Sequence, residues 1–153
     1  MHRMLIAVAL LAAVSCGGSA PQSSASPAPS RPVAPATVAL ASNPRFGSIL
    51  ADGNGRTVYL FEADKGSSST CYGACAAYWP PVLTNGAPAA ANGVNPSLLG
   101  TTKRTDGTTE VTYAGHPLYY VVTDRSPGDA TGQAVNNFGA AWYVLGMDGN
   151  KIP

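Results

Sequence analysis

An internal repeat constrains the fold of this chain more than any other feature. The segment 58–79 can be aligned with the segment 118–142. In each copy an aspartate stands five positions after a tyrosine, and a Gly-containing turn, a run of small residues and a tryptophan follow (Tyr59, Asp64 and Trp79; Tyr119, Asp124 and Trp142). Such self-similarity is typical of a unit that cannot bury its apolar face alone. We therefore expect two halves that pack face to face, neither of them stable by itself.

Alternating apolar and polar residues beyond position 45 predict short β-strands. Two hairpins are predicted, one around Asp52-Gly53-Asn54-Gly55 (strands 46–51 and 56–62) and one around a type I′ turn at Asp106-Gly107 (strands 101–105 and 108–114). Further strands are expected at 117–123 and 141–146, and short helices at 72–78 and 96–99. The predicted fold class is mainly β: a small sandwich- or barrel-like domain built from two related β-rich repeats, with minor helix.

The N-terminal segment has the pattern of an export signal. Arg3 gives a positive start, and the apolar run 4–14 is shorter than the roughly 20 residues of a transmembrane helix. Ala13-Val14-Ser15 then places small residues before Cys16, which resembles a lipobox. We predict a signal peptide at 1–15 and lipid attachment at Cys16, to the cell membrane or the outer membrane. The alternative is ordinary cleavage, which would release an unmodified secreted protein.

The segment 16–44 is predicted to be a tether. After Cys16 it is rich in Pro, Ser and Ala, has no aromatic residue, and carries Arg31 as its one charge. This composition favours an extended spacer over a folded core. The folded domain is therefore placed at 45–153, with repeats at about 47–83 and 108–149.

The charge balance argues against a nucleic-acid partner. Without the signal segment the chain has eight basic and eight acidic residues, and the basic ones are scattered along the sequence. Binding to phosphate backbones requires clustered Lys and Arg. The partners that we expect are the membrane, through the lipid, and a cell-wall or small-molecule ligand.

The first repeat resembles a family of secreted bacterial repeats, often predicted lipoproteins, with a Tyr-x-(Phe/Trp/Tyr)-x-x-Asp motif. Tyr59, Phe61 and Asp64 fit the motif in full. Tyr119 and Asp124 match it in the second repeat, where Val121 replaces the aromatic residue and no cysteines are present. The family's function is unassigned, so the resemblance implies a location and a fold unit but no chemistry.

The remaining cysteines, Cys71 and Cys75, predict a disulfide, because an exported protein meets an oxidising environment. If they are helical, their spacing brings the two Cα atoms near the distance that a disulfide needs. The alternative is a copper site, in which Cys71 and Cys75 join His116, the only histidine outside the signal segment. The preferred expectation is a structural disulfide and no cofactor.

No enzyme signature is found in the sequence. A Gly-x-Ser-x-Gly nucleophile motif does not occur. Asp64 and Asp124 precede turn sequences, so they are interpreted as residues that hydrogen-bond nearby backbone amides. We expect a non-enzymatic structural or binding role at the cell envelope, with envelope redox or copper handling as the alternative.

Overall fold

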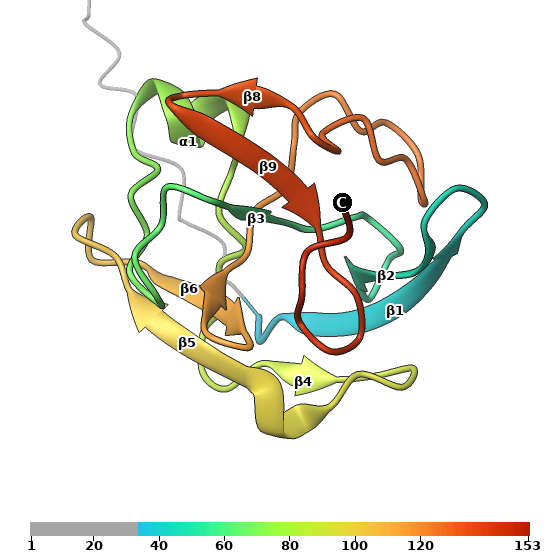
Figure 1. Cartoon of the computed structure of the whole chain (residues 1–153). Helices are drawn as coiled ribbons and strands as arrows, with labels where there is room; N and C mark the ends of the chain where they lie inside the picture. The colour runs from blue at the N-terminus through green and yellow to red at the C-terminus, as the bar shows by residue number, and fades with distance from the viewer. Residues whose placement is uncertain (1–33) are drawn as a thin grey trace, which may run out of the picture. The chain divides into compact units, whose positions relative to one another are not determined.

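The computed structural model describes residues 34–153, and its strands form three sheets of three strands each (Figure 1). In the first sheet β1 (Thr37–Asn43) lies between β2 (Gly47–Asp52), which is antiparallel to it, and β4 (Ala89–Ala90), which is parallel. In the second, β9 (Ala140–Val144) lies between β3 (Tyr59–Phe61) and β8 (Asn136–Asn137). In the third, β6 (Thr109–Tyr113) lies between β5 (Leu99–Lys103) and β7 (His116–Pro117).

Two short helical segments complete the fold, close to where they were predicted. They are the helix α1 (Ala74–Tyr78) and a 3-10 turn at Pro96–Leu98. The mainly β class with minor helix is confirmed. Over residues 34–153 the sheets remain separate and do not close into a barrel. No helix in the same range is long and apolar enough to cross a bilayer.

The predicted boundary between tether and domain is wrong. β1 lies inside the segment 16–44, and its Val38 and Ala39 are buried against the core. The backbone N–H of Ala36 also donates to the Thr84 hydroxyl. The strand was missed because small residues (Ala, Ser, Thr) dominate it, and its composition is that of the Pro-rich segment before it. Cys16 and the predicted signal peptide lie outside the described residues.

The hairpin around Asp106-Gly107 does not use the predicted two-residue type I′ turn. Arg104 N–H donates to the Thr108 carbonyl and Gly107 N–H donates to the Arg104 carbonyl, which leaves a three-residue loop with Gly107 at φ +85°. The turns at 52–56 and 146–150 have the same hydrogen bonds and also place a left-handed glycine before the last residue. An aspartate-containing loop that ends in glycine suits this three-residue form as well as the shorter one.

The predicted strand at 117–123 is mostly irregular. Only Pro117 belongs to a strand, whereas Tyr119 forms isolated bridges with Tyr59 on one side and Pro81 on the other. Each of these bridges consists of one residue pair, so the segment does not form a continuous strand. The segment nevertheless contributes to both parts of the core, since Leu118, Tyr119 and Val121 are buried.

The core has two parts. One is mainly aliphatic and is built around Val38, Leu50, Val58, Val111 and Leu118. The other is aromatic and contains Tyr59, Phe61, Trp79, Tyr119 and Trp142. Every residue that defines the repeat, apart from the two aspartates, belongs to this aromatic part, so it contains the candidate site.

Candidate functional site

The motif tyrosines of the two repeats pair with each other. Tyr59 N–H donates to the Tyr119 carbonyl (2.8 Å), and Tyr119 N–H donates to the Tyr59 carbonyl (3.0 Å). Both residues are fully buried. Any antiparallel pair of this kind has a local two-fold axis, and here the paired residues occupy equivalent positions of the two repeats. The two repeats are thus related by an approximate two-fold axis that passes between these tyrosines.

Each tyrosine hydroxyl donates a hydrogen bond to the motif aspartate of the other repeat. Tyr59 Oη donates to Asp124 Oδ2 (2.6 Å), and Tyr119 Oη donates to Asp64 Oδ2 (2.8 Å). Burial raises the pKa of both tyrosines above the ordinary value, and the carboxylate each one faces raises it further. The hydroxyls therefore remain protonated donors, and the motif of each repeat is completed by the other.

The second oxygen of each aspartate closes its own turn. Asp64 Oδ1 accepts the backbone N–H and the hydroxyl of Thr70, and Asp124 Oδ1 accepts the same two groups of Thr131. The interpretation of both aspartates as turn residues is confirmed. The two threonines were not identified from the sequence, although each lies six or seven positions after its aspartate and so belongs to the repeat.

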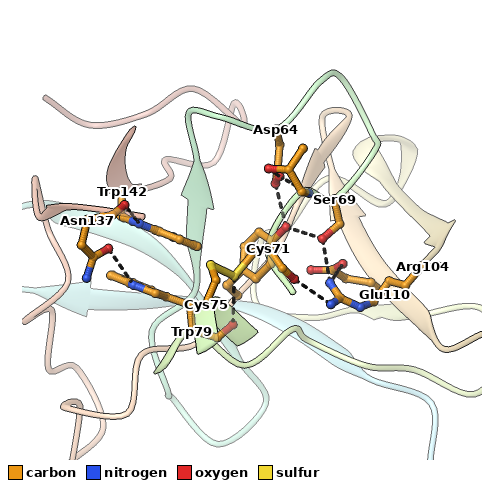
Figure 2. The surroundings of a disulfide bond; sticks show 11 residues. Asp64, Ser69, Cys71, Cys75, Trp79, Arg104, Glu110, Asn137 and Trp142 are labelled. Carbon is orange, nitrogen blue, oxygen red and sulfur yellow. Dashed lines mark hydrogen bonds and ion pairs between the residues drawn. A yellow bond between two sulfur atoms is a disulfide. The ribbon is translucent and has the colours of Figure 1, made fainter. Parts of the chain in front are cut away.

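The two tryptophans stack on each other at the same axis (Figure 2). Their rings are 3.9 Å apart and nearly parallel, and Phe61 stacks on the outer face of Trp142 at 4.0 Å. Both indole N–H groups donate to one residue: Trp79 to the side-chain oxygen of Asn137, and Trp142 to its carbonyl. Since β9 pairs with β3, Trp142 of the second repeat is held beside Phe61 of the first.

Cys71 and Cys75 form a disulfide in the structure, with their Cα atoms 5.2 Å apart (Figure 2). Cys71 lies before α1 and Cys75 within it, so the bond closes the turn that leads to Trp79. Both residues are buried in the aromatic part of the core. The disulfide is therefore a local clamp beside the stacked tryptophans.

We expect the double variant Cys71→Ala/Cys75→Ala to lose about 2 kcal/mol of unfolding free energy, because so short a loop constrains the unfolded chain only weakly. Denaturant unfolding of the oxidised wild type and the variant measures this. Reduced wild-type protein is the control and should fall close to the variant. Complete loss of folding in both would instead make the disulfide indispensable.

The second repeat has glycine where the first has Cys71. Gly132 follows Thr131 as Cys71 follows Thr70, and it is buried. A Cβ atom at Gly132 would lie 2.6 Å from Trp79 and 2.9 Å from Tyr59. Because carbon atoms do not approach so closely, this half cannot accept a cysteine without repacking. The absence of a cysteine at the position that corresponds to Cys71 thus has a steric cause.

A buried ion pair, Arg104 with Glu110, lies beside the first repeat (Figure 2). Arg104 donates to Glu110 Oε2 (2.8 Å), to the Ser69 hydroxyl (2.7 Å) and to the Cys71 carbonyl (2.8 Å). Ser69 lies 2.7 Å from Tyr119 Oη, and since Tyr119 gives its proton to Asp64, Ser69 donates to Tyr119. A continuous chain of donors therefore runs from Arg104 to Asp64.

Burial dominates the electrostatics of this network. It raises the pKa of Glu110 to about 7, although the hydrogen bond from Arg104 opposes the shift, and Glu110 Oε1 has no partner. Burial also raises the pKa of Asp64, against the hydrogen bonds from Tyr119 and Thr70. Sequence reasoning missed Arg104 and Glu110, because a basic residue near a turn and an acidic residue in a strand both suggest exposed positions.

His116 is not joined to the cysteines. It lies on β7 and lines a hollow with Glu62, Asp64 and Lys151, whereas Cys75 lines a different one. Within residues 34–153 no three or more His, Cys, Asp or Glu side chains are grouped so that they could hold a metal ion. In the structure Cys71 and Cys75 are bonded to each other, and His116 lines a hollow that neither of them lines.

The repeat pattern also matches known sequences. Residues 42–83 and 100–146 match the profile of a family described as a secreted repeat of unknown function. The two matches cover more than half of the chain, begin somewhat before the repeats predicted from the sequence, and confirm the resemblance. No curated protein and no solved structure matches the chain.

Proposed function

The chain belongs to this family of secreted repeats, and from that membership we propose that it is an extracytoplasmic lipoprotein. In the proposal Cys16 carries the lipid, and the domain has a non-enzymatic structural or binding role at the cell envelope. The family supports a location outside the cytoplasm. The small residues before Cys16 and the short apolar run support lipid attachment at that cysteine.

One observation supports the non-enzymatic role: the motif side chains hydrogen-bond to one another. Each motif aspartate accepts hydrogen bonds from the other repeat's tyrosine and from its own threonine. A general acid or base must reach a substrate, and a nucleophile needs an adjacent base. The two tyrosines are fully buried, and each aspartate uses both of its carboxylate oxygens in hydrogen bonds within the fold, so we assign the function to the domain's surface rather than to the motif.

In this proposal the segment between Cys16 and β1 is the spacer. β1 begins at Thr37, so about 20 residues separate it from the lipid. As a loose coil they would span roughly 25 Å, more if the prolines keep them extended. The domain would thus be held close to the membrane, but clear of its surface.

We expect Cys16→Ser to abolish membrane attachment. Removing the thiol removes the acyl chains, and each buried methylene contributes about 0.8 kcal/mol to anchoring. Incorporation of a labelled fatty acid and the fraction of protein that sediments with membranes measure the effect. The matched control Cys71→Ser/Cys75→Ser should stay labelled and bound. If Cys16→Ser kept its label and sedimented with membranes, the anchor would be wrongly assigned.

The alternative of copper handling by Cys71, Cys75 and His116 requires reduction of the disulfide first. Metal analysis of the reduced chain after exposure to copper(I) separates the two ideas. One bound copper that is lost in His116→Ala would favour the alternative. Retention of no copper would support a structural disulfide.

A further inference from the structure

The turn between β8 and β9 holds an exposed aromatic residue in an unfavourable conformation. Phe138 and Gly139 form a two-residue loop with φ +54° and +95°, the signature of a type I′ turn. Asparagine is the preferred residue at the first of these positions, because left-handed backbone is costly for bulky side chains. The Phe138 side chain is also 46% exposed. Neither the backbone nor the core explains a phenylalanine here.

A second exposed ring lies beside it. Tyr78, at the end of α1, is 37% exposed, and its ring centroid is 6.4 Å from that of Phe138. Both rings stand on rigid supports. Asn137, next to Phe138, accepts the N–H groups of Trp79 and Trp142, and the disulfide fixes the helix that carries Tyr78 (Figure 2). A ligand on these rings would therefore meet a surface that is already ordered.

The hollow beside Phe138 has no charged side chain in its lining. It measures about 470 Å³ and is lined by Phe61, Tyr72, Phe138, Cys75 and Thr70 together with two alanines. Three other hollows on the described domain contain charged residues: Asp52; Glu62, Asp64 and Lys151; and Arg56, Asp124 and Arg125. The lack of charge favours a neutral occupant, and the size lies within the range of small-ligand sites.

We propose that Phe138, Tyr78 and the hollow beside Phe138 bind a neutral sugar ring of a glycan. A sugar ring has a C–H face that packs on aromatic rings and an edge of hydroxyls that suits two lining residues with hydrogen-bonding capacity left: Tyr72, whose hydroxyl accepts the Thr105 N–H and keeps its proton to donate, and Thr70, whose hydroxyl donates to Asp64 and can still accept. The inference rests on the proposed function, since an envelope domain on a short tether lies next to cell-wall glycan. It adds to that function the ligand class and the site.

The test uses the full chain carrying Cys16→Ser, which lacks the lipid-attachment thiol, and a neutral N-acetylglucosamine tetramer as the probe. Calorimetric titration gives the Kd. The informative variant is Phe138→Asn, which removes the ring but suits the turn, so it should melt at or above the parent temperature. We expect its Kd to rise at least about tenfold. The matched control is Met147→Asn, which removes another exposed apolar side chain (55% exposed) and should leave the Kd unchanged.

Either of two titration results would overturn the proposal: no saturable binding of the tetramer by the parent chain, or equal affinity in Phe138→Asn. Binding of an apolar dye that Phe138→Asn abolishes, without sugar binding, would also overturn it and would point to an apolar partner. Fatty-acid labelling at Cys16 tests the lipoprotein assignment independently of the sugar site. A chain that is anchored but does not bind the tetramer refutes only the sugar site.

Discussion

Trp142→Ala is expected to lower the free energy of unfolding by about 3–5 kcal/mol, as large-to-small changes of buried aromatic residues do. Trp142 is fully buried and packs between Trp79 on one face and Phe61 on the other. Its removal leaves a cavity where the two repeats meet. Since small domains have a total stability of about 5–15 kcal/mol, the variant should be partly or wholly unfolded at 37 °C.

The approximate two-fold axis makes this prediction sharper. Trp79→Ala should cost about as much as Trp142→Ala, and the double variant less than the sum, because the two rings stack directly on each other. Denaturant unfolding followed by far-ultraviolet circular dichroism measures all three. Met147→Ala, at an exposed site, should stay within about 0.5 kcal/mol of the parent. A loss below about 1 kcal/mol for Trp142→Ala would contradict a core shared between the repeats.

The sequence predicts this arrangement in part. The spacing of Tyr59, Asp64 and Trp79 and its recurrence at Tyr119, Asp124 and Trp142 indicate two related halves and a shared core. The spacing does not indicate that each tyrosine bonds the aspartate of the other repeat. A repeat pattern is the same whether its contacts form within one copy or between two copies. Only the three-dimensional pairing of Tyr59 with Tyr119 decides between them.

Two other features were hidden for physical reasons. β1 has the composition of a linker, and it becomes a strand because β2 and β4 supply its hydrogen bonds and the core buries Val38. Arg104 and Glu110 occupy positions that suit exposed residues, and they are buried because each neutralises the other. Tertiary context overrides local composition in both cases. Phe138, in contrast, follows its local sequence into a turn and remains exposed.

Arg104→Met is expected to cost about 3–5 kcal/mol, because it leaves the Glu110 carboxyl buried without its partner. Methionine keeps most of the apolar stem, so the loss measures the missing charge and its hydrogen bonds rather than a cavity. The double variant Arg104→Met/Glu110→Leu should recover the part of the loss that comes from the unpaired carboxyl, whereas the Ser69 hydroxyl and the Cys71 carbonyl lack the Arg104 donor in both variants. Lys151→Met, which breaks the exposed pair with Glu62, should unfold like the parent. Equal losses in the single and double variants would contradict the prediction.

The pH dependence of this loss distinguishes a buried charge from damaged packing. Burial raises the Glu110 pKa from 4.5 to about 7, so between these values the folded state keeps a proton that the unfolded state has released. The contribution of Glu110 to the free energy of unfolding therefore falls as pH rises through that window, by about 3 kcal/mol at most. The variant Glu110→Gln should lack this pH dependence.

Removing Arg104 raises the Glu110 pKa further, because the guanidinium no longer opposes the effect of burial. Arg104→Met should consequently lose least near pH 4.5, where Glu110 is largely protonated in the folded protein, and most above pH 7. Denaturant unfolding across this range measures the difference, and a loss that is constant with pH would mean that packing, not charge, accounts for the cost.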